Sequence, residues 1–504
     1  MAGTSLLVGL PAFGARGLPV ARKVSRELPA TAMDQLSGVA NNSPVLVTDP
    51  TEERFVVMAN RLDAPDFGCA LQLSGNGGRT WVTANPVPKL PGGAEKCYGP
   101  EAAFDAKGML YYLFVGLAGP GNEPVGAFLT TSADRGRSFS AARRVLGPLN
   151  FAVRMAIDPG LGQRGRIHLV WLHATSDPGI GSFGPPPNPI LAAYSDNGGR
   201  SFSKPVQVSE AKRDRVVAPA LALGPGGRVD IAYYDLQGDA RDYQNLEGPV
   251  WEGTWSVVLV QSQDGGRHFS PGVDVDASVV PPERPILIFT MPSPALAAGP
   301  GSRVCVGWTD ARLGDPDVMV RCSPDDGRRW REAVRVNDDP PGNGHRQYMP
   351  RLSVAPDGRL DAIFYDRRRD PENAANDVVL ASSSDGGRRF TPNLRLTSEP
   401  SPGGVGPQYQ GPAAEGQYEI GSRLGLLSRR SGVVAAWADT RNSRPQTTGE
   451  DIFATTVMLE HARSSPVWAR RAGVAFLVVG IAGLVAAVRR RSPSADPQGR
   501  ARRT

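Results

Sequence analysis

One eight-residue motif occurs six times in this 504-residue chain, and it constrains the fold more than any other feature. Each copy begins with Ser, has Asp or Asn at the third position and Gly at the fifth, and ends with Phe or Trp. Successive copies begin 58, 63, 67, 61 and 60 residues apart, at residues 74–81, 132–139, 195–202, 262–269, 323–330 and 383–390. Such a regular period is typical of a repeat architecture in which each repeat is one supersecondary unit.

The residues of this octet predict a β-hairpin turn with an anchoring side chain. Ser and Asp side chains bond nearby backbone groups, Gly supplies a position with φ > 0, and the terminal aromatic ring plugs inward. Around one copy, short strands are expected at 218–223, 229–233, 256–261 and 273–275, so that one repeat contains four strands. The 59 Gly and 46 Pro residues also favour a turn-rich β protein over a helical one.

The octets resemble the Asp boxes, or bacterial neuraminidase repeats, of the sialidase superfamily. The resemblance covers roughly residues 42–460. It implies an all-β propeller in which the octets join the third and fourth strands of the blades. It also implies that the loops between second and third strands gather on the opposite face.

The last repeat determines the expected number of blades. Residues 420–459 repeat the first three strands of a blade but have neither an octet nor a fourth strand. Residues 19–25 resemble fourth strands such as 205–209 and can supply the missing one. Pairing the two chain ends in one blade closes the ring and removes an exposed edge. We therefore predict seven four-stranded blades over residues 19–460, with the six blades of the sialidase family as the alternative.

The C-terminal segment predicts a membrane anchor. Residues 472–488 carry no charge and are flanked by arginines on both sides, although their length is at the short limit for a spanning helix. A buried C-terminal helix is the alternative. With a spanning helix, residues 461–471 become a juxtamembrane linker, residues 489–504 a basic cytoplasmic tail, and residues 1–18 the remnant of a signal segment. The propeller would then lie outside the cell, tethered to its membrane.

The distribution of charge along the chain indicates which class of partner it can bind. The net charge is +6, and residues 470–504 supply +7 of it through eight Arg and one Asp, which leaves 6 − 7 = −1 for the remainder. A near-neutral body argues against a nucleic-acid partner.

Cys69 with Cys97, and Cys305 with Cys322, are placed to form two disulfides, with unpaired buried thiols as the alternative. No metal-binding spacing occurs, so we predict that the protein holds no metal or other cofactor. Separately, we expect it to be a monomer.

The family resemblance also implies a catalytic site. Sialidases use three arginines to grip the substrate carboxylate, a Tyr with an adjacent Glu as nucleophile, and an Asp as general acid/base. Arg61 matches a pocket arginine, and Asp66 or Asp63 lies near the acid/base position. Tyr418 and Glu419 form the candidate nucleophile pair.

Further arginines are candidate substrate-binding residues. Arg154 and Arg351 lie at the starts of innermost strands, and an aromatic-x-Asp-x-Arg pattern supplies three more, Arg312, Arg368 and Arg441. For the last three, the structural alternative is an ion pair that ties the strand end to a neighbouring blade. One departure from the family argues against sialic acid cleavage. Residues 41–44 are Asn-Asn-Ser-Pro where the family has an Arg-Ile-Pro motif, so the first carboxylate-binding arginine is absent.

Two functions are therefore predicted side by side. One is an exported, membrane-anchored glycoside hydrolase of the exo-α-sialidase type, and the other is a non-catalytic propeller that binds glycan or protein at the cell surface. Three arginines that converge on the propeller axis beside a Tyr-Glu pair and an Asp would favour the enzyme. Arginines that are each salt-bridged to their own blade would favour the binding protein.

Overall fold

Short strands joined by Gly-rich turns make up the computed structural model of the chain. It describes residues 20–24, 28–29, 40–64, 66–84, 89–160, 165–175, 187–213, 215–239, 252–282, 291–406, 420–443 and 449–460.

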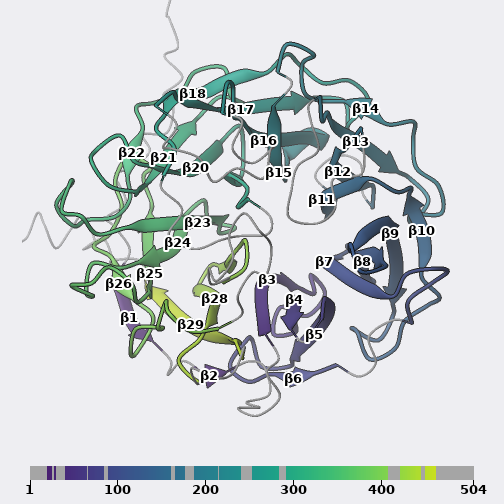
Figure 1. The fold of residues 1–504 in the computed structure, drawn as a ribbon, viewed down its shortest axis with the longest axis horizontal. Coiled ribbons are helices and arrows are strands. Elements are labelled where there is room, and N and C mark those ends of the chain that lie inside the picture. The colour runs from purple at the N-terminus through teal and green to yellow at the C-terminus, as the bar shows by residue number, and fades with distance from the viewer. Residues whose placement is uncertain are drawn as a thin grey trace, which may run out of the picture. The chain divides into compact units, whose positions relative to one another are not determined.

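The strands form seven antiparallel blades around a common axis, with strands such as β3, β7 and β11 nearest the axis (Figure 1). Blades 1 to 3 contain β3 (Ala40–Thr48), β4 (Val56–Ala64), β5 (Gly68–Ser74) and β6 (Val82–Thr83), then β7 (Lys96–Phe104), β8 (Leu110–Ala118), β9 (Glu123–Ser132) and β10 (Arg143–Leu146), then β11 (Asn150–Ile157), β12 (Ile167–His173), β13 (Ile190–Ser195) and β14 (Val206–Gln207).

Blades 4 to 6 repeat the same strand order. They contain β15 (Val216–Gly224), β16 (Arg228–Asp235), β17 (Trp255–Ser262) and β18 (Val273–Val279), then β19 (Ala295–Ala298), β20 (Val304–Asp310), β21 (Asp317–Ser323) and β22 (Val334–Arg335), then β23 (Gln347–Val354), β24 (Leu360–Asp366), β25 (Asp377–Ser383) and β26 (Leu394–Arg395). A single 3-10 turn, η1 (Pro225–Gly227), joins β15 to β16.

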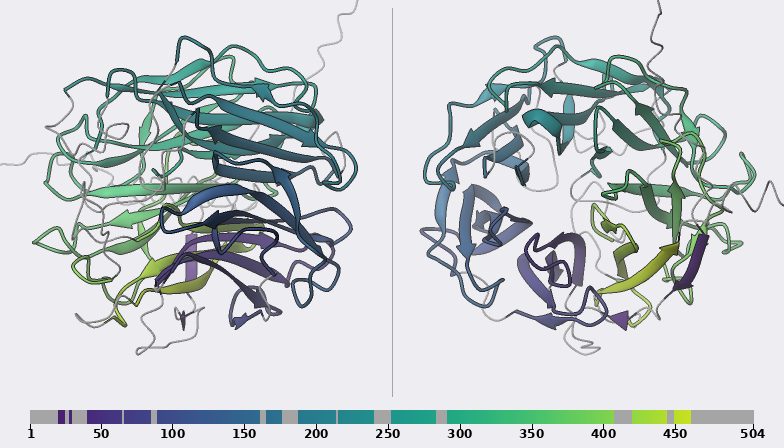
Figure 2. Two further views of the ribbon diagram at one scale, coloured as in Figure 1. Left: turned by 45° about the vertical axis from the view of Figure 1, so that its right-hand side comes forward. Right: turned by 180° about the vertical axis from the view of Figure 1, so that it is seen from behind.

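Blade 7 is built from both ends of the described chain. It contains β27 (Gly425–Arg429), β28 (Gly432–Asp439), β29 (Asp451–Glu460) and, as the fourth strand, β1 (Val20–Val24); the two-residue β2 (Leu28–Pro29) also pairs with β29. β1 runs antiparallel to β29, and Figure 2 shows the two strands side by side from behind as well. The predicted seven blades and their closure by an N-terminal strand are confirmed, and the six-bladed alternative is wrong.

The hydrophobic core lies between the blades. Trp255 of blade 4 packs in one cluster with Trp308 of blade 5, and Tyr365 of blade 6 packs with Trp437 of blade 7. Met58 of blade 1 packs with strands β28 and β29 of blade 7, which completes the ring. Each blade is thus covered on both faces, and burial of each large apolar side chain contributes about 1.5–3 kcal/mol.

Each octet forms the turn between the third and fourth strands of its blade, as expected. In the first copy, Ser74 Oγ accepts a hydrogen bond from the Gly78 N–H at 2.9 Å, and Asn76 Oδ1 accepts one from the Thr80 N–H at 3.0 Å. The other five copies repeat both bonds. Bonds from Ser138 lower the pKa of Asp134 to about 2. The Ser and the Asp or Asn therefore hold the turn, as the sequence predicted.

The fifth position of every octet faces the preceding blade. A Cβ on Gly136 of blade 2 would lie 2.8 Å from Leu71 of blade 1, and one on Gly78 of blade 1 would lie 2.7 Å from Val434 of blade 7. Because no side chain fits there, the octets serve as close contacts between blades as well as turns.

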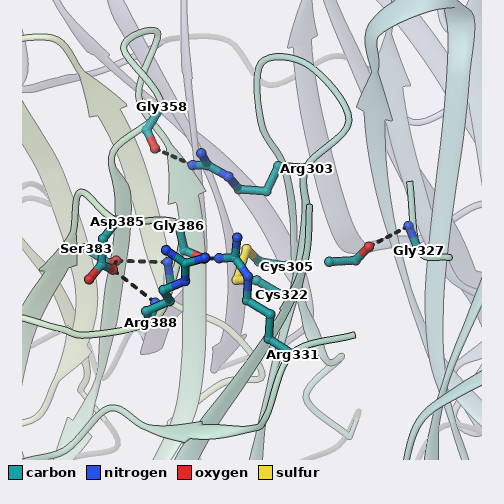
Figure 3. The surroundings of a disulfide bond; sticks show 12 residues. Arg303, Cys305, Cys322, Gly327, Arg331, Gly358, Ser383, Asp385, Gly386 and Arg388 are labelled. Atoms are coloured by element: carbon teal, nitrogen blue, oxygen red, sulfur yellow. Dashed lines mark hydrogen bonds between the residues drawn. A yellow bond between two sulfur atoms is a disulfide. The ribbon is translucent and has the colours of Figure 1, made fainter. Parts of the chain in front are cut away.

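Both expected disulfides are formed, and the alternative of unpaired thiols is wrong. Cys69 and Cys97 join β5 of blade 1 to β7 of blade 2. Cys305 and Cys322 face each other across β20 and β21, and Figure 3 shows this bond beside the octet of the next blade.

No helix among the described residues is long and apolar enough to cross a membrane. Four predicted segments lie wholly outside the described residues: 1–18, 461–471, 472–488 and 489–504.

Candidate functional site

Most innermost strands share a distortion that aims one side chain at the axis. In β7, β11 and β23 the ladder shifts register directly before Glu101, Arg154 and Arg351. Two residues before each of these, the backbone adopts a positive φ, at Gly99, Ala152 and Met349, and Gly421 stands in the same relation to Arg423. Such bulges re-orient a side chain relative to the regular pleat.

Four of these side chains form one group, here called the axial arginine cluster: Arg154, Arg351, Arg423 and Glu101. Arg423 of blade 7 forms an ion pair with Glu101 of blade 2, and Arg154 Nη1 of blade 3 lies 3.4 Å from Glu101 Oε1. Arg154 Nη2 also donates to Ser293 Oγ, which precedes β19 of blade 5, at 3.1 Å. Blades 2 and 7, like blades 3 and 5, are not neighbours in the ring. Their side chains can therefore meet only at the hub.

Arg423 also anchors the cluster to the backbone. It donates to the Pro100 carbonyl at 2.6 Å and to the Ser43 carbonyl at 3.1 Å. Arg351 is different, because within the described part of the chain its Nε has no hydrogen-bond partner although it is buried. Backbone carbonyls thus hold one arginine of the cluster, whereas another retains an unsatisfied donor atom.

The cluster carries an unbalanced positive charge in buried surroundings. Three guanidinium groups less one carboxylate leave a formal charge of 3 − 1 = +2. Burial, followed by the charge of Arg423, lowers the pKa of Arg154 to about 10 and also lowers the pKa of Arg351. Both remain protonated at neutral pH, so an anion is the complementary ligand.

A second polar group adjoins the cluster. Arg61 Nη1 donates to the Tyr98 hydroxyl at 2.8 Å, and Arg61 Nε lies 2.6 Å from Asp63 Oδ1. Asn42 Nδ2 donates to Asp63 Oδ2 at 2.7 Å and to Glu450 Oε2 at 3.1 Å. Tyr98 lies on the same strand as Glu101 and close enough to Arg154 to influence its pKa.

The structure brings together some of the predicted site residues and not others. Arg154 and Arg351 lie in the cluster, and Arg61 lies in the adjoining group. Asp66 is exposed and forms an ion pair with Lys96 at 3.1 Å. Tyr418 and Glu419 lie outside the described residues.

Three residues of the site escaped the sequence analysis: Arg423, Glu101 and Tyr98. A signal for two of them was present, since Arg423 and Glu101 each follow a Gly by two residues at the start of an innermost strand. That spacing alone does not say which blades face each other. The convergence becomes visible only once the ring is closed.

The remaining predicted arginines have the geometry of the structural alternative. Each pairs with the Asp two residues before it and reaches the preceding blade. Arg312 lies 2.9 Å from Asp276 of β18 in blade 4, and Arg368 Nη2 lies 3.4 Å from Asp339, which follows β22 of blade 5. Arg441 lies 2.5 Å from Asp439 and 3.3 Å from Ser398. Their positive charges are already compensated by carboxylates.

No cluster of His, Cys, Asp and Glu suited to a metal ion occurs among the residues that the structure describes.

No protein-family model and no curated protein matches the sequence. Among solved structures, an ulvan lyase is similar over 86% of this chain and 96% of its own, at 12% identity and a TM-score of 0.46. An α-L-arabinanase from Penicillium chrysogenum matches over 72% and 93%, at 14% identity and a TM-score of 0.40. A Hadza microbial sialidase matches over 82% and 75%, at 14% identity and a TM-score of 0.40. These values are too low for the likeness to support an argument about activity.

Proposed function

We propose that the axial arginine cluster binds the anionic group of an acidic sugar, and that the chain is a sialidase-like glycoside hydrolase acting on terminal sugars of this kind. The observation that carries the proposal is that Arg154 of blade 3 and Arg423 of blade 7 meet at Glu101, while Arg351 of blade 6 lies near enough for the charges of Arg423 and Glu101 to influence its pKa. Arginines suit this task because their planar groups bind a carboxylate in a bidentate manner.

The general acid and the nucleophile are assigned from the chemistry of their side chains. Asp66 is the proposed general acid, and Tyr418 with Glu419 is the proposed nucleophile pair. Tyr98 is a second candidate nucleophile, because the Arg61 guanidinium donates to its oxygen and would stabilise the phenolate. Tyr418 would pass its proton to Glu419, and Tyr98 would pass its proton to water, so that either attacks the anomeric carbon as a phenolate while Asp66 protonates the departing oxygen. Water would then cleave the sugar from the tyrosine and return the proton to the phenolate.

A specific observation favours the rival function, a propeller that binds acidic glycans without cleaving them. Asp66 is exposed and paired with Lys96, whereas the general acid of a glycosidase usually lies in a buried pocket beside the substrate. The two functions share the arginine cluster and differ only in turnover.

The test uses the purified chain with fluorogenic sialosides and uronosides, and with unlabelled acidic sugars in calorimetry. Arg351→Met is the variant of choice, because loss of Arg351 leaves few groups without a partner. We expect it to lower kcat/KM, or the affinity, about 100-fold, as for loss of a charge-assisted hydrogen bond. Arg369→Met, at an exposed position, is the matched control and should change neither.

The outcomes separate the two functions. If the wild-type chain cleaves an acidic sugar and the Arg351→Met variant does not, the result supports the hydrolase. Binding of acidic sugars without turnover supports the rival. A wild-type chain that neither binds nor cleaves any acidic sugar contradicts both.

We further propose that residues 472–488 span a membrane, with residues 489–504 in the cytoplasm and the propeller outside the cell. The support is the uncharged run between arginines, together with two disulfides that suit an oxidising compartment. Co-purification of the full chain with lipid nanodiscs tests this anchor.

A further inference from the structure

The sixth position of the octet is Arg in all six copies: Arg79, Arg137, Arg200, Arg267, Arg328 and Arg388. The second position is different in every copy, and the seventh is Thr, Ser, His or Arg. All six arginines are exposed. Because this Arg recurs at an exposed position while the second and seventh positions vary, it calls for a reason outside the core.

The turn itself does not require these side chains. The sixth residue contributes its backbone N–H, as when Arg137 N donates to Asp134 Oδ1 at 3.0 Å, and any residue except Pro can do this. None of the six guanidinium groups forms an ion pair within the described part of the chain. By contrast, Arg329 and Arg389 at the seventh position pair with Asp325 and Asp385 at 2.7 and 3.0 Å.

Four of the six carboxylates in the octets are already paired with arginines other than these six. Asp196 pairs with Arg166 at 2.6 Å and Asp326 pairs with Arg228, while Asp325 and Asp385 pair with the arginines at the seventh position. The octet face, defined as the six octets and the β27–β28 turn, therefore presents a ring of uncompensated positive charge. Such a ring is complementary to an extended anionic surface.

The chain leaves the propeller on this same face. β29 ends at Glu460, and Gly432 at the start of β28 pairs with Met458 near that end. The β27–β28 turn lies against the first octet, because Arg429 donates to the Gly77 carbonyl at 3.2 Å. Only residues 461–471 separate Glu460 from the uncharged run. Eleven residues span at most about 40 Å, even when fully extended.

We propose that the octet face is a docking surface for the anionic phospholipid headgroups of the membrane that anchors the chain, which rests on the proposed anchor at residues 472–488. The linker keeps the six arginines within reach of that membrane, where each adds attraction to an anionic leaflet. The face opposite the octets, where the second strands join the third, is turned away from the membrane and toward solutes.

The test reconstitutes the full chain into nanodiscs of phosphatidylcholine, with or without 30% (about one lipid in three) phosphatidylglycerol, a fraction within the range of anionic leaflets. Phenylglyoxal then modifies accessible arginines, and peptide mass spectrometry gives a rate for each. We expect phenylglyoxal to modify the six arginines at least about three-fold more slowly in discs that contain phosphatidylglycerol than in discs that lack it. At 0.5 M salt the Debye length is only about 4 Å, so the rates in the two kinds of disc should become about equal. Arg369, exposed after β24 on the opposite face, should react equally in all discs.

A pair of matched variants tests the charge directly, with exposed Arg430 in the β27–β28 turn as reporter. Changing all six arginines to Gln should remove the protection of Arg430 by phosphatidylglycerol, and changing them to Lys should keep it. Co-purification with both discs but equal rates would overturn the docking surface and leave the anchor intact. Association only with phosphatidylglycerol discs would support the docking surface and contradict the anchor. Association with neither would overturn both.

Discussion

At the scale of single residues, the fourth and fifth octet positions show how the turn also forms contacts between neighbouring blades. Both lie in the left-handed region, and the fifth is always Gly. The fourth is Gly in four copies but Arg135 and Asp326 in the others, with φ of 64° and 58°. Arg135 pairs with Asp49 of blade 1 at 2.7 Å, and Asp326 pairs with Arg228 of blade 4. These inter-blade ion pairs offset the cost of a non-Gly residue there.

Gly387→Ala should destabilise the protein more than an ordinary left-handed Gly→Ala change. The new Cβ would lie 2.4 Å from Cys322 Sγ, which the disulfide prevents from moving, and φ is +81°. We expect a loss of about 2–4 kcal/mol in the free energy of unfolding, from overpacking plus strain.

Gly226→Ala is the control for this change, because φ is +74° there and nothing lies within 4 Å of the added Cβ. It should cost only about 1 kcal/mol in urea unfolding. Equal losses in the two variants would show that contact with the preceding blade is unimportant.

At the scale of elements, β1 completes blade 7 by pairing with β29, from Val20 opposite Glu460 to Val24 opposite Val457. Without β1, the β29 edge would present unpaired backbone groups to solvent. Of the pairing between the N-terminal segment and β29, only the two residues of β2, opposite Ala454 and Phe453, would then remain.

Removing residues 1–24 should therefore lower the thermal midpoint and make the protein aggregate. The effect should exceed that of removing residues 1–18, which spares the strand. Light scattering during a thermal scan measures both. A midpoint equal to that of the full chain would contradict a closing role for β1.

The sequence was sufficient to predict the octet turns, the blade count and the closing strand, because each depends on local residue types and a regular period. The axial arginine cluster was only partly predictable. Arg154 and Arg351 were recognised at strand starts, whereas Arg423 and Glu101 depend on a positive φ two residues earlier, at Gly421 and Gly99, which no local pattern of hydrophobicity reveals. The pairing of Arg312 with Asp276 likewise depends on which strands become neighbours.

At the scale of the whole molecule, arginines join one blade to the next around the octet face. Arg166 of blade 3 donates to the Gly265 carbonyl of blade 4 at 2.8 Å, and Arg303 of blade 5 donates to Gly358 of blade 6 at 2.6 Å (Figure 3). Arg359 of blade 6 is bonded to three carbonyls around the β27–β28 turn of blade 7. The ring is therefore fastened by polar contacts as well as by its core.

The Cys69–Cys97 disulfide adds a covalent link between neighbouring blades, because it connects blades 1 and 2 across a sequence separation of 28. Replacing both cysteines with Ser should lower the free energy of unfolding by about 3–4 kcal/mol, the loop-closure value for this length. Denaturant unfolding of the oxidised protein measures the loss. The double variant Cys305→Ser/Cys322→Ser, whose bond lies within blade 5 and spans 17 residues, should lose somewhat less.

The place of β1 in the last blade also sets the order in which the molecule can be assembled. The strand that ends at residue 24 must wait until residue 460 has been made, so 460 − 24 = 436 further residues must be added first. At about 5–20 residues per second, translation holds the leading segment without its partner for roughly 20–90 s. A ribosome thus releases an open arc of blades, and the arc becomes a ring only when the newest strand meets the oldest.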